Sequence, residues 1–303
     1  MSELDPIVLI EVEKRFGRKK VHRGLDLAVP RGSVTALLGR NGAGKSTLLQ
    51  MLTGLMPRDG GEIRVLGMDP WREPLKVKAA VGYVAEHTAF HPKWRVRDTI
   101  DLVRSLRKAR WDRKEEWRLV DLFELPLGEK IGKLSKGYRA KLALLLALAH
   151  RPEVLLLDEP ASGLDPIVKR EVLASIVDTI TEEGRTVLLS SHQMEDVERL
   201  ADRVAFLAGG RIVLEGCTEE IRTNARRLAV GPIEDDRPLA DLPGDPFVAR
   251  RGREAVLTYL DGTNGAAELL GERFRDVNEI GVNLEDLFVD LLGAPREREE
   301  VVA

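Results

Sequence analysis

The sequence predicts an α/β protein with a large domain built on a mostly parallel β-sheet, followed by a small α+β extension. Short apolar segments alternate with longer segments of helical periodicity up to about residue 220, which is typical of parallel strands connected by helices. The segment 153–158 has a continuous apolar run that ends in an acid, as in a strand buried on both faces. After residue 227, several prolines and a glycine lie among acidic residues and indicate a linker before a second unit.

Each element of the large domain is expected from its local pattern. Apolar runs of strand length predict strands, and apolar residues at a spacing of three to four predict helices. The first strands are not separated by long helices, so the early part is expected to be β-rich, and the segment from about 86 to 150 is expected to form a helical insert. The expected elements are strands 7–12, 25–29 and 33–38, helix 45–52, strands 62–66 and 81–84, helices 97–110, 113–123 and 136–150, strand 153–158, helix 167–180, strand 186–190 and a hairpin of 204–207 with 211–214.

The C-terminal part predicts a small separate unit. Segments 247–250 and 254–260 flank Arg251-Gly252-Arg253 as an expected hairpin, followed by expected helices at 266–274 and 284–292. We therefore expect three parts: a domain at 1–225, an accessory domain at 226–293 and a charged tail at 294–303.

Composition narrows the class of protein. With 303 residues, 43% of them hydrophobic and 32% charged, the chain can bury one large or two modest cores. A net charge of −3 argues against a general nucleic-acid binder. The single cysteine, Cys217, excludes an intrachain disulfide and a cysteine zinc site, as expected in a reducing cytoplasm. The longest apolar run, 142–149, is far shorter than the roughly 20 residues that span a bilayer, and the acidic N-terminus lacks a signal pattern, so we expect a soluble cytoplasmic protein.

The segment Gly39-Arg-Asn-Gly-Ala-Gly44-Lys45-Ser46 lies between an expected strand and an expected helix. In this order a chain leaves a strand, wraps a phosphate with backbone N–H groups and enters a helix. The glycines allow positive φ angles and close approach, Lys45 supplies a positive charge to the β- and γ-phosphates, and Ser46 supplies a hydroxyl to Mg²⁺. A Gly-rich turn without a ligand is the alternative. The pattern and its context predict a polyphosphate site.

Two adjacent acids, Asp158 and Glu159, end the strand expected at 153–158. One of them can hold Mg²⁺ through water, and the other, on the opposite side of the strand end, can polarise a nucleophilic water. A solvated acid pair without function is the alternative. Together with the phosphate loop upstream, the pair indicates hydrolysis.

His192 follows the strand expected at 186–190, so its imidazole should emerge at the carboxyl edge of the sheet beside Lys45 and Asp158. There it can contact a γ-phosphate and hold Glu159. A lone histidine is more often structural, but this placement favours a functional one.

Leu134-Ser135-Lys136-Gly137-Tyr138 precedes an expected helix, whose N-terminus offers unpaired N–H donors. By itself this is an ordinary helix cap. With the other motifs it indicates a second anion site. A turn at Ser162-Gly-Leu-Asp165, which also precedes a helix, completes the set.

Over about residues 7–220 the chain resembles the nucleotide-binding subunits of ATP-binding-cassette (ABC) transporters, with these motifs in the family's order and spacing. The resemblance implies a P-loop NTPase cassette with a mostly parallel core sheet, an antiparallel β subdomain and a helical insert. It implies ATP and Mg²⁺ as cofactors. It implies catalysis by Glu159, by the switch histidine His192 and by Lys45, and magnesium binding by Ser46 and Asp158. The nucleotide-binding residues that it implies are those of the Walker A loop, the signature and the D-loop: Gly39, Asn41, Gly42, Gly44, Lys45, Ser46, Thr47, Ser135, Gly137 and Asp165.

Four positions in three motifs depart from the family pattern. Phe16, after the first expected strand, takes the place of the usual tyrosine that stacks on adenine; stacking needs only the π-face, and a core aromatic is the alternative. The signature, commonly Leu-Ser-Gly-Gly-Gln, has Lys136 and Tyr138 in place of the first glycine and the glutamine. Glu86 occupies the position of the Q-loop glutamine, where it can ligate Mg²⁺ but adds negative charge, so an altered rate or coupling is expected.

In the family that the chain resembles, ATP lies between the phosphate loop of one subunit and the signature of another. The resemblance therefore implies a homodimer or a dimer with a related subunit. The chain would bind the inner face of the cell membrane through a separately encoded permease, with 90–96 and its Trp94 as the candidate docking edge, or with Trp94 in the core. The narrower resemblance is to bacterial export and resistance systems, in which the permease selects the substrate. The C-terminal unit resembles accessory extensions of such subunits, with a role in dimer contact, regulation or stability.

Two other classes of protein are alternatives. A soluble cassette protein acting on ribosomes or nucleic acid would resemble two cassettes in one chain or a cassette split by a long coiled coil, and the sequence has neither a repeat nor sustained heptads. An unrelated P-loop kinase or GTPase would leave 135–138 and His192 without a role. The sequence therefore favours a transporter ATPase, with no nucleic-acid partner expected.

Overall fold

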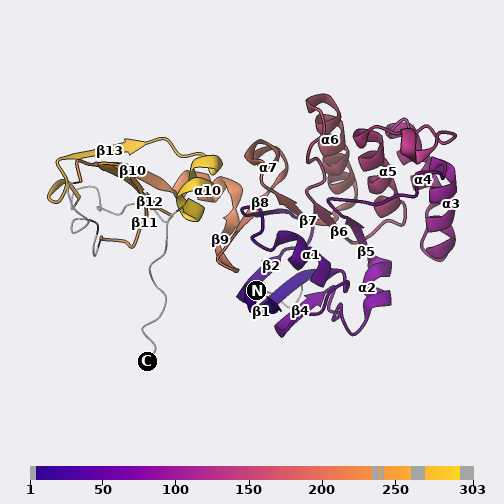
Figure 1. Cartoon of the computed structure of the whole chain (residues 1–303), viewed down its shortest axis with the longest axis horizontal. Helices are drawn as coiled ribbons and strands as arrows, with labels where there is room; N and C mark the ends of the chain where they lie inside the picture. The colour runs from indigo at the N-terminus through magenta and orange to yellow at the C-terminus, as the bar shows by residue number, and fades with distance from the viewer. Residues whose placement is uncertain (1–4, 234–238, 240–241, 261–269, 294–303) are drawn as a thin grey trace. The chain divides into compact units, whose positions relative to one another are not determined.

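The computed structural model describes residues 5–233, 239, 242–260 and 270–293. The chain forms two compact units, Met1–Glu215 and Gly216–Ala303, which are drawn in Figure 1. This division lies before the domain border expected at residue 225.

The first unit is built on a six-stranded sheet with the order β5-β6-β7-β3-β8-β9. Strands β5, β6, β7, β3 and β8 run parallel, as expected from their apolar runs. The register pairs Leu38 with Ser191 and Asp158 with Ser190, so β3, β6 and β7 end at the same edge of the sheet. The strands are β3 (Val34–Leu38), β5 (Val81–Val84), β6 (Val154–Asp158), β7 (Thr186–Ser191), β8 (Arg203–Ala208) and β9 (Arg211–Cys217).

A second, antiparallel sheet with the order β2-β1-β4 packs on the same core. Its strands are β1 (Ile7–Phe16), β2 (Lys19–Val29) and β4 (Gly60–Val65). Helix α1 (Lys45–Leu52) lies between the two sheets, because Leu48 and Leu49 share one buried cluster with Leu27 of β2 and Leu156 of β6. The β-rich start and the antiparallel β subdomain that the family resemblance implies are therefore confirmed.

Strand β1 is longer than its sequence pattern indicated. It continues through several register shifts to Phe16, which pairs with Lys19 across the turn at Gly17. Phe16 is therefore the last residue of β1, whereas the sequence pattern placed it after the strand. Pairing with β2 extends β1 through polar residues that resemble a loop in the sequence.

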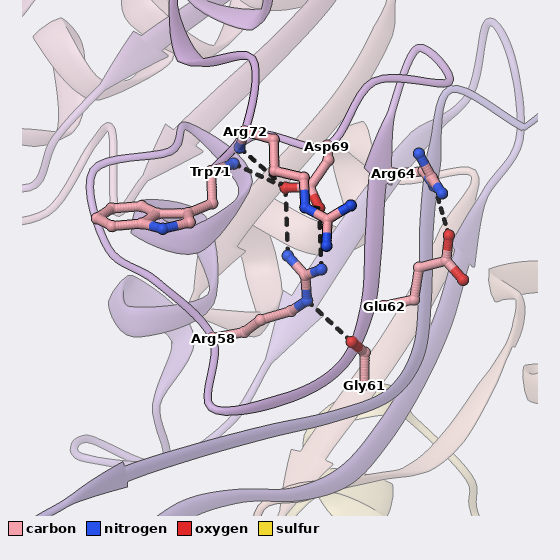
Figure 2. Close-up of polar contacts among 7 residues, drawn as sticks. All are labelled: Arg58, Gly61, Glu62, Arg64, Asp69, Trp71 and Arg72. Carbon is pink, nitrogen blue, oxygen red and sulfur yellow. Dashed lines mark hydrogen bonds and ion pairs between the residues drawn. The ribbon is translucent and has the colours of Figure 1, made fainter.

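The loop between β4 and α2 (Pro74–Ala80) is held by one buried carboxylate, shown in Figure 2. Asp69 accepts hydrogen bonds from Arg58 at 2.9 and 3.2 Å and from the backbone N–H groups of Trp71 and Arg72. The Arg58 guanidinium lowers the pKa of Asp69, and its Nε donates to the carbonyl of Gly61. This network connects the antiparallel sheet to the segment that leads into β5.

The expected helical insert lies between β5 and β6 and is grouped at one side of the first unit in Figure 1. Its first two helices are joined by a bidentate contact of Arg104 with the buried Glu116, at 2.8 Å for both bonds. The remaining helices of the first unit are α3 (Val96–Leu106), α4 (Arg113–Leu122), α5 (Lys136–Leu148), α6 (Pro166–Glu183) and α7 (Met194–Leu200).

The second unit contains a four-stranded antiparallel sheet with the order β11-β12-β10-β13. Arg227 of β10 and Asp290 of α10 form an ion pair of 2.7 Å, and neither side chain is exposed. Thr258 of β12 donates to the same Asp290 oxygen at 2.7 Å. The elements are α8 (Thr218–Asn224), β10 (Arg226–Gly231), β11 (Phe247–Arg251), β12 (Glu254–Tyr259), β13 (Asp276–Ile280) and α10 (Leu284–Gly293).

The hairpin of β11 and β12 and the final helix confirm their predictions, whereas α2, α7, α8, β10 and β13 were not expected. Of the helix expected at 266–274, residues 266–269 lie outside the described residues; 270–274 are described, and only 270 and 271 are helical. The tail at 294–303 lies outside the described residues. Within the described part of the chain, no helix has the length and hydrophobicity that crossing a bilayer requires.

Candidate functional site

The phosphate loop connects β3 to α1. Gly42 and Gly44 have φ angles of 81° and 107°, which side chains rarely allow. A Cβ at Gly39 would lie 2.9 Å from the carbonyl oxygen of Leu207, so this position also needs glycine. The loop opens onto the N-terminus of α1, where unpaired N–H groups and the helix dipole favour a bound anion.

Lys45 is the first residue of α1 and is almost fully buried. Its ammonium donates to the carbonyl of Gly39 at 2.8 Å and lies 3.4 Å from Oε1 of Glu159. The Glu159 carboxylate therefore neutralises the positive charge of Lys45, which is the charge that a bound phosphate would contact. Ser46 and Thr47 follow in the first turn of α1 and are half-buried, while Asn41 is exposed in the loop.

Asp158 ends β6 and is buried. Its Oδ1 accepts a 2.7 Å hydrogen bond from Ser190 Oγ, and the same hydroxyl accepts from the backbone N–H of Glu159 at 3.0 Å. Burial, and secondly the Asp158 carboxylate, raises the pKa of Tyr83 to about 12. Sequence reasoning missed Ser190; a hydroxyl at the end of an apolar strand was its only signal.

Glu159 follows the strand with a φ of 49°, an uncommon value for a residue with a side chain. Its Oε1 faces Lys45, and its Oε2 lies 2.8 Å from Nδ1 of His192. The side chain thus bridges the phosphate loop and the end of β7. Because Nδ1 of His192 is occupied, Nε2 is the ring nitrogen left for a ligand; it has no hydrogen-bond partner among the residues that the structure describes.

The signature segment begins α5. Ser135 caps this helix, with its Oγ accepting from the N–H of Tyr138 at 3.2 Å. Gly137 is buried against Val168 of α6, and the ammonium of Lys136 lies against Gly163 of the D-loop.

Asp165 caps α6 by accepting from the N–H groups of Ile167 at 3.2 Å and Val168 at 3.1 Å. Contacts within the described part of this chain bring the signature and the D-loop together. They do not join Ser135 or Gly137 to Lys45 or Glu159.

Two predicted ligand residues lie at the edge of this arrangement. Phe16 is 49% exposed, which rules out the core alternative, and Lys14 lies 5.5 Å from its ring centroid. Glu86 is exposed after β5, and no contact in the described chain brings it to Asp158 or Ser46.

Donor chemistry fits a magnesium ion beside the phosphates. The described residues contain no group of three or more histidine, cysteine or acidic side chains able to hold a metal. The Ser46 hydroxyl and the Asp158 carboxylate are hard oxygen donors, and Mg²⁺ typically takes one or two such ligands and completes its shell with water and substrate phosphates.

Comparison with known proteins decides the family. The family profile described as ABC transporter matches residues 22–162. The chain is 34% identical to "Daunorubicin resistance ATP-binding protein DrrA3" of Streptomyces coeruleorubidus, over 95% of this chain and 96% of that protein. It is 35% identical to "Uncharacterized ABC transporter ATP-binding protein YhaQ" of Bacillus subtilis, over 96% and 100%. The chain belongs to the ABC transporter ATP-binding proteins.

Solved structures agree with this assignment. "Structure of ATP binding subunit of ABC transporter" is 26% identical and covers 72% of this chain and 92% of its own, with a TM-score of 0.65. This ABC protein is therefore an ATPase, the ATP-binding subunit of a transporter, and its fold is the predicted cassette. Nothing in these comparisons supports the alternative of a ribosome-associated protein.

Proposed function

We propose that this ABC subunit powers export through a separate membrane permease, with ATP and Mg²⁺ held between two cassette subunits. Relatives named for daunorubicin resistance and for Nod factor export, the latter 31% identical over 95% of this chain, support an exporter. The observation that carries the mechanism is the position of Glu159 between Lys45 and His192.

In this mechanism Lys45 leaves Glu159 and binds the β- and γ-phosphates when nucleotide enters the loop. Glu159, still oriented by His192 through a 2.8 Å contact, then accepts a proton from the attacking water. With a proton on each ring nitrogen, His192 donates from Nδ1 to Glu159 and from Nε2 to the γ-phosphate. Ser46 and Asp158 would hold Mg²⁺, which would supply positive charge beside the phosphate oxygens. Phe16 would stack on the adenine, and the exposed Glu86 would offer a further oxygen donor if its segment moved toward the metal.

The partner subunit supplies the second half of the site. Ser135 and Gly137 sit at the start of a 13-residue helix whose N-terminal N–H groups suit a phosphate, yet they have no contact with this chain's own Lys45 among the described residues. A second cassette, a copy of this chain or a related subunit, would bring its signature to the phosphate loop. Asp165 then lies at the interface, since it caps α6 beside the signature.

A groove in the first unit suits the permease. A cavity of about 300 Å³ is bordered by β5, α3, α5 and the segment after α1. Its lining includes Leu55, which is 56% exposed, and the cationic Arg107. The edge 90–96 is a second contact candidate. There Trp94 is 39% exposed and its ring lies 5.4 Å from that of His91, so it is not a core residue. Docking at these sites would place the subunit on the inner face of the membrane.

Turnover and oligomeric state test this proposal together. Wild type should hydrolyse ATP, whereas Glu159→Gln should bind ATP, lose turnover by a factor on the order of 100 to 10,000 and accumulate as a dimer in light scattering. Glu153→Gln, at the exposed start of the same strand region, is the matched control and should behave as wild type. A Glu159→Gln chain that turns over ATP normally, or one that stays monomeric with ATP, would contradict the shared site. In native cells, the subunit should sediment with membranes.

A further inference from the structure

Lys14 of β1 is a buried lysine beside the aromatic residue that ends the strand. Lysine is rarely buried unless its charge is paired, so this position needs an explanation. Lys14 and Phe16 are two positions apart, and their side chains therefore leave the strand on the same face. The ammonium lies over the Phe16 ring, 5.5 Å from its centroid, which is within the range of a cation–π interaction. A cation thus covers one face of a ring that still reaches solvent.

The position of this ammonium is fixed by hydrogen bonds. It donates to the carbonyl of Pro57 at 2.7 Å and to Asp59 at 3.4 Å. Asp59 also accepts from the backbone N–H of Arg15 at 2.6 Å, and its own N–H donates to the carbonyl of Glu13 at 2.9 Å. The hydrogen bond from Arg15, and secondly the ammonium of Lys14, lower the pKa of Asp59 and keep it charged. The end of β1 is therefore fastened on both sides of Lys14.

The segment that binds the ammonium follows directly from α1, the helix at the phosphate loop. The N–H groups of Leu55 and Met56 donate to the carbonyl of Gln50 at 2.9 and 3.2 Å, so this segment is held against the end of the helix. Through it, Lys14 connects the ring of Phe16 to α1. A nucleotide that contacts both the ring and the phosphate loop needs the two at a fixed separation.

The charge of Lys14 also affects what the ring can stack on. The faces of aromatic rings are negative, so two rings stacked face to face repel each other unless they are offset. A cation on one face draws π-electron density toward itself and makes the opposite face less negative. That opposite face is then better suited to the electron-rich ring of adenine.

We propose that Lys14 is a positioning residue for nucleotide binding, which supports Phe16 from one face so that the other face stacks on the base. Because its side chain is buried, Lys14 acts through the ring and does not touch the nucleotide. The inference rests on the proposed stacking of adenine on Phe16. Its consequence is that Lys14 contributes to the affinity for a nucleotide and not to the affinity for a phosphate chain without a base.

Calorimetric titrations of the full chain with ADP and with pyrophosphate, both with Mg²⁺, test this role without turnover. In Lys14→Met the Kd for ADP should rise about three- to tenfold, while the Kd for pyrophosphate stays within about twofold of wild type. In a Phe16→Ala background, Lys14→Met should cause no further loss of ADP affinity, because the ring through which it acts is absent. Lys14→Gln can still donate to Pro57 but has no charge; it is the second variant if methionine prevents folding, and its ADP affinity should also fall.

Lys20→Met is the matched control. Lys20 is an exposed lysine of β2 that pairs with Arg15, and in the described part of the chain it has no contact with the Phe16 ring. This variant removes the same charge, so both Kd values should stay within about twofold of wild type.

Three results would overturn the inference: unchanged ADP affinity in Lys14→Met, an equal loss of ADP and pyrophosphate affinity, or a further loss in the Phe16→Ala background. The last two would mean that Lys14 acts through its charge on the phosphates or through folding. Wild-type ADP affinity in Phe16→Ala alone would instead refute the stacking on which the inference rests.

Discussion

Replacing Gly137 with alanine is expected to push the signature helix α5 away from α6 and to lower ATP turnover. The added Cβ would lie 2.5 Å from Cγ1 of Val168 and 3.4 Å from its Cβ and Cγ2. Carbon atoms normally approach to about 3.5–4.0 Å, so the first contact requires a shift of roughly 1 Å or more. Val168 cannot rotate away cheaply, because a valine in a helix strongly prefers one rotamer.

The cost follows from two opposing effects. Overpacking of this kind destabilises by about 1–3 kcal/mol, and alanine returns about 0.5–1 kcal/mol of helix propensity relative to glycine. A net loss of about 1–2 kcal/mol corresponds to a melting temperature about 2–8 °C lower for a domain of this size. A shift of about 1 Å in a group that must meet a phosphate can reduce turnover on the order of 100-fold.

Thermal unfolding and phosphate-release assays on three variants separate packing from ligand contact. Val168→Ala removes the clashing Cγ1 and leaves only the 3.4 Å contact to Cβ, which is ordinary. Gly137→Ala/Val168→Ala should therefore match Val168→Ala alone in both melting temperature and turnover, because the nearest atoms that the new Cβ meets all belong to Val168.

Two results would refute this reasoning. Wild-type stability and turnover in the Gly137→Ala variant would mean that α6 moves away from the new Cβ without a loss of folding free energy. A double variant as inactive as the single one would mean that Gly137 is needed for close approach of a ligand.

Three further predictions concern other parts of the chain. Burial lowers the pKa of His22 to about 4 and that of His150 to about 3, so the unfolded chain binds protons that the folded chain does not. Urea titrations should therefore show stability falling as the pH drops below 6.5, by up to about 1.4 kcal/mol per pH unit for each histidine, until about pH 4 for His22 and about pH 3 for His150. Phe16→Ala should weaken ATP binding by about 1–3 kcal/mol in a fluorescence titration, and Phe16→Tyr should not, because stacking needs an aromatic face. Equal ATP affinity in the two variants would mean that Phe16 does not stack on the adenine. Arg227→Met should destabilise the second unit by about 3–5 kcal/mol in calorimetry, since it removes the 2.7 Å ion pair of the buried Asp290 and leaves it with Thr258 and with Arg251 at 3.8 Å; an unchanged transition would show that these two partners suffice.

Much of the site could be predicted from the sequence because its parts are local. The helix at 45–52 and the strand at 81–84 begin and end where their patterns indicated. The glycines of the phosphate loop, the acids at the end of β6 and the histidine after β7 each mark the end of a recognisable strand. Since parallel strands end at one edge of a sheet, their meeting could be inferred before any contact was known.

Other elements depend on partners distant in the sequence. Strand β10 precedes prolines and acidic residues that indicated a linker, yet it is central in its sheet because β12 and β13 pair on its two sides. The Asp158–Ser190 hydrogen bond joins residues 32 positions apart and follows from the β6–β7 register. No local pattern marks such pairs.

The sequence by itself determined the chemistry of this ABC subunit: a phosphate loop, a pair of acids and a histidine, each recognisable from backbone sterics and hydrophobic period over a few residues. Only the tertiary structure decided that Glu159 bridges Lys45 and His192, that Gly137 packs on Val168 and that His22 lies under Gly44. The physical reason is that local conformation depends on near neighbours along the chain, whereas these contacts depend on strand order and close packing.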